Sequence, residues 1–105
     1  MRILFDQGTP VPLRAALTGH RVETAYERGW ATLQNGDLLN AAEQNGIDLL
    51  ITTDQSLKYQ QNLPARRIAI IVLKSANWRL IQTKLDAIRD ACLAIVEGGY
   101  VEIEI

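Results

Sequence analysis

The sequence predicts an α/β fold, in which helices form layers on both faces of a mainly parallel, five-stranded sheet. Apolar runs typical of strands alternate along the chain with segments of helical periodicity, which is typical of a three-layer α/β/α arrangement. Two of the runs, residues 47–53 and 68–73, are apolar enough to be strands buried on both faces. With 105 residues and no linker-like change in composition, residues 1–105 are expected to form one domain.

The first quarter of the chain predicts two strands with a helix between them. Ile3–Phe5 is a short apolar run that ends at Asp6. Thr9 is expected to cap a helix, because threonine accepts hydrogen bonds from free backbone N–H groups and Pro10 suits the first helical position. Residues 22–26 alternate between apolar and polar side chains, which indicates a second strand.

The middle of the chain predicts a helix followed by a buried strand. A loop over residues 27–36 leads to a helix that starts near Asp37 and is stopped by Gly46. The strand over residues 47–53 then ends at a second acidic position, Asp54. A short helical piece is expected after it.

The last part of the chain predicts a buried strand, a long helix and an edge strand. Residues 68–73 form the strand, and apolar residues spaced three and four apart from Trp78 to Ile95 indicate one long amphipathic helix. Beyond Gly98, apolar side chains alternate with two glutamates over residues 101–105, as expected of a half-exposed edge strand.

In sheets of this kind, ligands bind beyond the carboxyl ends of the strands, where the strand order reverses. If the first strand lies between the second and the third, the reversal falls between the first and the third. Asp6 and Asp54 are then neighbours, and Asp37 opens its helix toward the same end of the sheet. The sequence therefore predicts three carboxylates around one crevice.

Three carboxylates in one crevice repel one another unless a cation joins them. Ligands that are all oxygen suit Mg²⁺ or Mn²⁺, which keep several waters and accept phosphate oxygens from a substrate. Asp6 and Asp54 are expected to bind such an ion directly, and Asp37 directly or through water. The bound ion would activate water for attack on a phosphodiester.

Each acid also has a structural explanation that competes with this one. Asp37 can be a helix N-cap, and Asp54 can cap the helix that follows it, because aspartate is favoured at such positions in any protein. Asp6 is harder to explain in this way, since a buried central strand rarely ends in an acid without a use for it.

The arrangement resembles the small PIN-like domains related to VapC-type toxin ribonucleases. The residues that carry the resemblance are Leu4-Phe5-Asp6-Gln7 with Pro10, Asp37-Leu38-Leu39, and Leu50-Ile51-Thr52-Thr53-Asp54. The resemblance implies that Asp6, Asp37 and Asp54 bind Mg²⁺ or Mn²⁺ for cleavage of RNA. It also implies a toxin that is paired with an antitoxin protein and forms a homodimer, for which the exposed last strand offers a contact.

Two departures from the PIN-like pattern leave alternatives open. Many relatives have further acids where this chain has Gln7 and Ser56. A catalytically weak or inactive PIN-like protein-binding module is therefore the second interpretation. A third, a receiver-like phosphate acceptor, requires an acid paired with Asp6, and Gln7 is not one.

Charge and composition restrict the partners. The net charge of −1 gives no global attraction to nucleic acid, so Lys74, Arg14 and Thr53 are the candidates for local contacts with a substrate. One cysteine, Cys92, and one histidine, His20, exclude an internal disulfide and a thiolate or multi-histidine metal site. With no signal peptide and no apolar stretch long enough to cross a membrane, the sequence predicts a soluble cytoplasmic protein.

Overall fold

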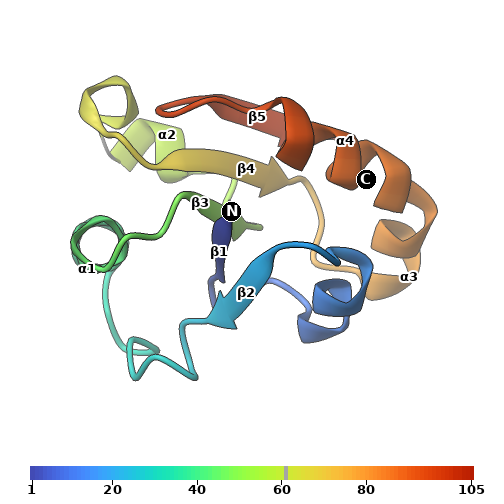
Figure 1. The fold of residues 1–105 in the computed structure, drawn as a ribbon, viewed down its shortest axis with the longest axis horizontal. Coiled ribbons are helices and arrows are strands. Elements are labelled where there is room, and N and C mark those ends of the chain that lie inside the picture. Colours follow the sequence, from blue (N-terminus) through green and yellow to red (C-terminus); the bar gives the residue numbers. More distant parts are fainter. Residues whose placement is uncertain (61) are drawn as a thin grey trace.

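Five parallel strands form one sheet in the computed structural model, which describes residues 1–60 and 62–105 (Figure 1). The strands are β1 (Arg2–Phe5), β2 (Arg21–Thr24), β3 (Leu49–Thr52), β4 (Ala69–Leu73) and β5 (Tyr100–Ile103). Their order across the sheet is β2-β1-β3-β4-β5, and each neighbouring pair is parallel. The predicted α/β class and the predicted place of the first strand between the second and the third are confirmed.

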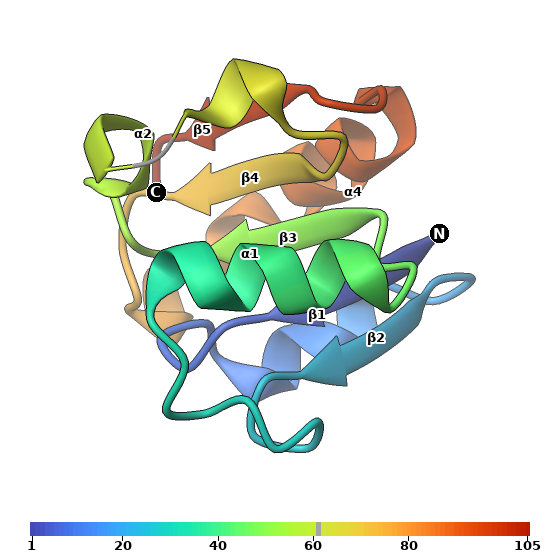
Figure 2. The same ribbon diagram turned by 90° about the vertical axis from the view of Figure 1, so that its left-hand side faces the viewer.

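Helices connect the strands and cover both faces of the sheet (Figure 2). The α-helices are α1 (Asn35–Gln44), α2 (Leu57–Gln60), α3 (Trp78–Ile81) and α4 (Leu85–Ala94), and the 3₁₀ helices are η1 (Val11–Ala16), η2 (Leu63–Ala65) and η3 (Gln82–Lys84). The arrangement is consistent with three layers. No helix among the described residues has the length and apolar character needed to cross a membrane.

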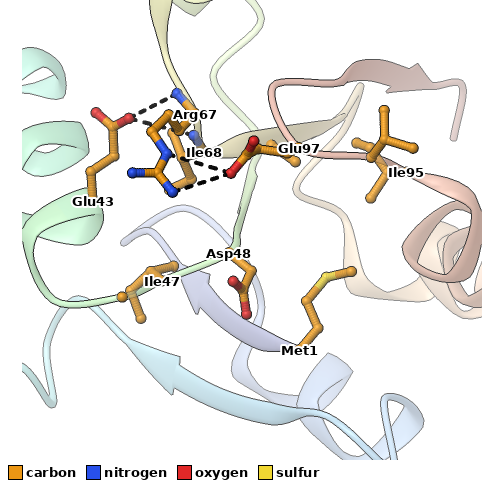
Figure 3. Close-up of a pocket in the computed structure, with 11 residues that line it drawn as sticks. Met1, Glu43, Ile47, Asp48, Arg67, Ile68, Ile95 and Glu97 are labelled. Carbon is orange, nitrogen blue, oxygen red and sulfur yellow. Dashed lines mark hydrogen bonds and ion pairs between the residues drawn. The ribbon is translucent and has the colours of Figure 1, made fainter.

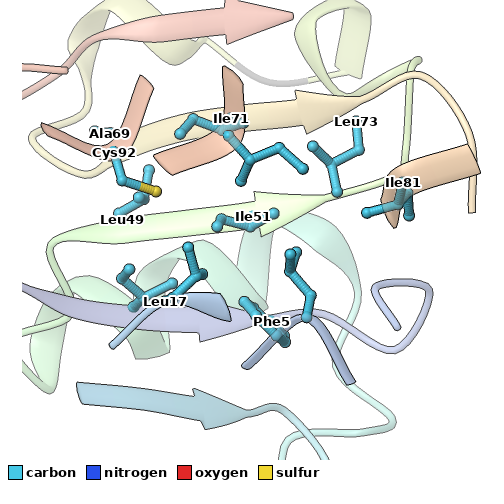
Figure 4. Packing of buried hydrophobic residues seen from close by; sticks show 12 residues of the cluster. Phe5, Leu17, Leu49, Ile51, Ala69, Ile71, Leu73, Ile81 and Cys92 are labelled. Carbon is cyan, nitrogen blue, oxygen red and sulfur yellow. The ribbon is translucent and has the colours of Figure 1, made fainter. Parts of the chain in front are cut away.

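Alternating side chains of the strands divide the core into two clusters. Ile3, Phe5 and Ile51 face η1, α3 and α4, and they belong to the cluster shown in Figure 4. Leu4 and Leu50 point to the opposite face, where α1 and α2 cover them. All of β3 and β4 is buried, as the apolar runs predict.

The last crossover between strands has the opposite hand to the other three. The connection from β1 to β2 runs in one direction across the sheet, over the face that η1, α3 and α4 cover. The connections from β2 to β3 and from β3 to β4 run in the opposite direction, over the face that α1 and α2 cover. All three connections are therefore right-handed (Figure 2). The step from β4 to β5 continues in the same direction but passes over the face of η1, α3 and α4. It is therefore left-handed, which is rare for parallel strands.

Two predicted helices differ from the observed ones. The first is a 3₁₀ helix over Val11–Ala16 that Thr9 does not cap, since its hydroxyl bonds to Asp6 and to the carbonyl of Ile51 instead. The predicted long helix over residues 78–95 is divided into α3, η3 and α4. At the break, the Thr83 hydroxyl donates to the Leu80 carbonyl at 2.6 Å and competes with the helical backbone bonds.

Smaller differences affect the ends of elements. The second strand stops at Thr24, and Tyr26 lies in the turn beyond it, 79% exposed. The helix expected near Asp37 begins two residues earlier, at Asn35. It ends at Gln44 with Asn45 as its C-cap, and Gly46, the predicted stop, follows with a positive φ of 75°. The last strand is an edge strand with half-buried side chains, as predicted.

Candidate functional site

Asp6 follows β1 directly and keeps its carboxylate half-buried at the carboxyl end of the sheet. Its Oδ1 accepts the Thr9 hydroxyl at 2.7 Å, and its Oδ2 accepts the Thr52 hydroxyl in a short hydrogen bond. Burial raises the pKa of Asp6 above the ordinary value, although these hydroxyls and nearby backbone N–H groups oppose the shift. Among the described residues, Asp6 makes no ion pair.

The hydroxyl of Thr9 faces two acceptors at once. Its Oγ1 lies 2.7 Å from Asp6 Oδ1 and 2.8 Å from the Ile51 carbonyl oxygen. Because a hydroxyl has one proton to donate, an ionised Asp6 leaves one of these close oxygen pairs without a proton between them. When the proton points to Asp6, the bond favours the charged form and opposes the effect of burial.

Thr52 connects Asp6 to Asp54. The register pairs Phe5 with Ile51, so Asp6 and Thr52 lie beside each other where the two strands end. Thr52 is 1% exposed, donates its hydroxyl to Asp6, and accepts the backbone N–H of Asp54 at 3.0 Å. One buried hydroxyl thus links the carboxylate of Asp6 to the backbone N–H of Asp54 at the predicted switch point.

The carboxylate of Asp54 lies in a more polar environment than that of Asp6. Oδ1 accepts the N–H of Ser56 at 2.9 Å and its hydroxyl at 2.7 Å, while Oδ2 accepts the side-chain amide of Asn35 at 2.8 Å. These donors lower the pKa of Asp54, with the Ser56 hydroxyl contributing most. The two linked acids therefore have pKa values shifted in opposite directions, a pattern found where a protein assigns different roles to two carboxylates.

Asp37 lies in the first turn of α1, with an exposed side chain. The N-cap position is Gln34, so the N-cap interpretation of Asp37 is wrong. The same turn also carries Asn35, and this residue, not Asp37, contacts Asp54. In residues 1–60 and 62–105, no three His, Cys, Asp or Glu side chains are grouped as a metal site.

The three candidate substrate contacts have different surroundings. The Arg14 guanidinium is 2.9 Å from Glu27, and the Lys74 ammonium is 3.0 Å from Glu104, so both cations are ion-paired within the chain. Thr53 is half-buried beside Gly8. A Cβ on Gly8 would lie 2.5 Å from Thr53 Oγ1, which explains why this turn needs glycine.

The two positions that depart from the PIN-like pattern have defined contacts. Gln7 donates its side-chain amide to the Ala31 carbonyl at 3.1 Å, which ties the loop before α1 to the turn after β1. Ser56 donates to Asp54, as described above. The sequence did not predict that Thr9 would bond to Asp6 or that Asn35 would bond to Asp54. The only signal in the sequence for hydrogen bonds to these acids is the pair of hydroxyl residues before Asp54, Thr52-Thr53.

A pocket of about 350 Å³ lies at the opposite end of the sheet, where β1, β3 and β4 begin (Figure 3). Its charged side chains mostly bind one another or nearby backbone. The N–H of Arg67 donates to Glu43 at 3.0 Å, its guanidinium contacts Glu97 at 3.4 Å, and Asp48 accepts the N–H of Arg2 at 2.7 Å. The pocket is remote from Asp6 and offers no concentrated charge of either sign.

Three further residues considered from the sequence have the following surroundings. Cys92 is fully buried, and burial raises the pKa of its thiol to about 11. Trp30 packs against the core on the α1 face, with the Arg28 guanidinium 4.6 Å from its ring centre. His20 is half-buried in the turn before β2, away from Asp6.

Comparisons of the chain with protein-family models, with curated proteins and with solved structures found no match.

Proposed function

We propose that this protein is a Mg²⁺- or Mn²⁺-dependent ribonuclease of the PIN-like class, which hydrolyses phosphodiester bonds of RNA. One observation carries the proposal: Asp6, whose charged form is disfavoured and which makes no ion pair in the described part of the chain, is joined through Thr52 to Asp54 where the strand order reverses. A cation in the crevice would supply the positive charge that the Asp6 carboxylate does not receive from any ion pair in the described part of the chain.

The donor atoms of the crevice suit a divalent metal ion. Both carboxylates offer only oxygen, and an oxygen with a single donor, as Asp54 Oδ2 has in Asn35, keeps a second lone pair for an ion. Asp6 and Asp54 would hold the ion, with Asp37 completing its shell directly or through water. Bound there, the ion would lower the pKa of a water molecule and stabilise negative charge on the phosphodiester.

The chain's own residues would orient the acids and the substrate. Thr9 and Thr52 fix the position of the Asp6 carboxylate, and Asn35 fixes that of Asp54. Thr53, Arg14 and Lys74 are the proposed contacts to RNA, the last two after exchange of their glutamate partners for phosphate.

The biological setting is proposed from the resemblance to VapC-type toxins. It consists of a cytoplasmic toxin with a cognate antitoxin protein, present as a homodimer. The edge strand β5, which is paired on one side only and has half-buried side chains, is the proposed contact between subunits.

The direct test is cleavage of labelled RNA in the presence of Mn²⁺. Wild-type protein should cleave, and Asp6→Asn should lose cleavage by a factor of about 100 or more, because a metal ligand is removed. Asp90→Asn is the matched control, since Asp90 is exposed on α4 and should leave the rate unchanged. Cleavage that is equal in Asp6→Asn and wild type would exclude this site.

A second candidate function is a binding module that keeps the scaffold without the chemistry. It is favoured by the hydrogen bonds that the Asp54 carboxylate already accepts, because Asn35 and Ser56 together donate to both of its oxygens. This alternative predicts tight association with a partner protein and no cleavage of total RNA at any Mn²⁺ concentration.

A further inference from the structure

Two lysines lie on the rim of the crevice next to Asp54. Thr52 of β3 pairs with Val72 of β4. Asp54 follows Thr52 by two residues and Lys74 follows Val72 by two residues, so both lie just beyond the same end of this strand pair. The side-chain amide of Gln55 also donates to the Lys74 carbonyl at 3.3 Å, which holds the two strand ends together. Lys58 lies close by in α2.

Both lysines are paired with glutamates of the last strand and its tail, but the two pairs differ. Lys58 is 2.8 Å from Glu102, whose side chain is 25% exposed and also accepts the Tyr100 hydroxyl at 2.7 Å. Lys74, which lies 3.9 Å from Glu102, is paired more closely with Glu104 at 3.0 Å, and the Glu104 side chain is 82% exposed. An ion pair as exposed as the second one contributes little and exchanges readily for another anion.

An exposed aromatic ring lies beside Lys58, on the same rim. Tyr59 is 81% exposed, and the Lys58 ammonium lies 5.1 Å from its ring centre. Exposed aromatic rings together with cations are how proteins bind single-stranded nucleic acid, because bases stack on the ring while phosphates contact the cations. A free phosphate or an acidic peptide would use the lysine but would have no need of the ring.

We propose that Lys74 and Tyr59 form a contact surface for single-stranded nucleic acid on this rim, and that the Glu104 carboxylate occupies the phosphate position until nucleic acid displaces it. Lys74 then contacts a backbone phosphate, a base stacks on Tyr59, and Glu102 keeps Lys58 in place. The inference rests on the proposed function for its ligand, but the binding itself requires no metal ion.

The test is the affinity for a fluorescein-labelled single-stranded oligodeoxynucleotide, measured by anisotropy in EDTA over a range of salt concentrations. Glu104→Gln should bind about two- to fivefold more tightly than wild type, the factor that corresponds to loss of one competing exposed ion pair. Because Lys74 contacts the same phosphate in both proteins, the slope of log K against log salt should be equal for wild type and Glu104→Gln, and it should become shallower by about 0.7 when Lys74 is replaced by Gln. Glu97→Gln is the matched control, because Glu97 is 71% exposed and pairs with Arg67 near the other end of the sheet.

Two further variants test the residues themselves. Adding Lys74→Gln to Glu104→Gln should remove the gain in affinity, and Tyr59→Leu should weaken binding about fivefold or more. Equal effects of Glu104→Gln and Glu97→Gln, a gain that persists without Lys74, or no binding by any form would overturn the inference. Because the assay excludes metal, cleavage of RNA that depends on Asp6 would still support the proposed function if these binding results were negative.

Discussion

Replacement of Thr52 by valine tests whether one buried hydroxyl holds the candidate site together. Valine has nearly the same shape as threonine, so the change removes hydrogen bonds and leaves the packing in place. Thr52 is 1% exposed, and its hydroxyl has two partners, the carboxylate of Asp6 and the N–H of Asp54. Both partners lose that bond in Thr52→Val.

The expected cost follows from those two groups. A carboxylate that loses a donor in a half-buried position costs about 2 kcal/mol, and a backbone N–H without a partner near the surface about 1 kcal/mol. Thr52→Val should therefore lower the free energy of unfolding by about 3 kcal/mol at pH 7. Asp6 keeps its bond from Thr9, which prevents a larger loss.

The loss should depend on pH. Burial raises the pKa of Asp6 above the ordinary value of 3.8, so folding takes up a proton and stability falls as pH rises through this range. Removing the Thr52 donor raises the pKa of Asp6 further, and the variant loses more stability over the same rise in pH. The difference from wild type should thus be largest at neutral pH and should shrink below about pH 4.

Urea unfolding followed by tryptophan fluorescence measures this difference at pH 7 and pH 3.5. Thr32→Val is the control, since Thr32 is exposed in the loop before α1 and should change stability by less than about 0.5 kcal/mol. A Thr52→Val effect below about 0.5 kcal/mol at pH 7, or one that is the same at both pH values, would refute the reasoning.

Three other predictions concern the core, the ion pair between α1 and the segment before β4, and the second acid. Cys92 should not react with an aromatic disulfide reagent at pH 8 in the folded protein, since it is fully buried with a thiol pKa of about 11, but should react at once in urea; rapid reaction of the folded protein would contradict this. The 2.6 Å pair of Arg66 and Glu43, 17% and 25% exposed, should show a coupling of about 1–2 kcal/mol in a double-mutant cycle of unfolding free energies, and a coupling near zero would contradict this. Asn35→Ala should raise the pKa of Asp54 toward its ordinary value, seen by NMR titration, and should cost stability above about pH 4 that disappears in acid; an unchanged pKa would show that the Asn35 bond has no effect.

The central part of the fold was predictable because its signals are local. The apolar runs of β3 and β4 leave no polar face, and acids follow the apolar runs of β1 and β3. Once strand order is known, those two facts place Asp6 beside Thr52 and near Asp54.

Other features depend on contacts that a pattern does not encode. The hydroxyl of Thr9 can either cap a helix or bond to Asp6, and which of these it does depends on how the strands pack beside it. Asn35 reaches Asp54 because α1 starts two residues before Asp37, a shift within the usual uncertainty of helix ends. The left-handed step from β4 to β5 leaves no trace in periodicity, since the helices are amphipathic in the same way on either face.

Calorimetric titration with Mn²⁺ tests the central claim, that Asp6 and Asp54 together form a divalent-metal site. Wild-type protein should bind Mn²⁺, and Asp6→Asn and Asp54→Asn should each lose that binding while Asp90→Asn keeps it. In EDTA, Asp6→Asn should be at least as stable as wild type, because the asparagine amide can donate to Thr9 and no charge is buried, so lost binding would not reflect unfolding. A wild type that takes up no Mn²⁺ at millimolar concentrations, or an Asp6→Asn variant that binds it as well as wild type, would contradict the account.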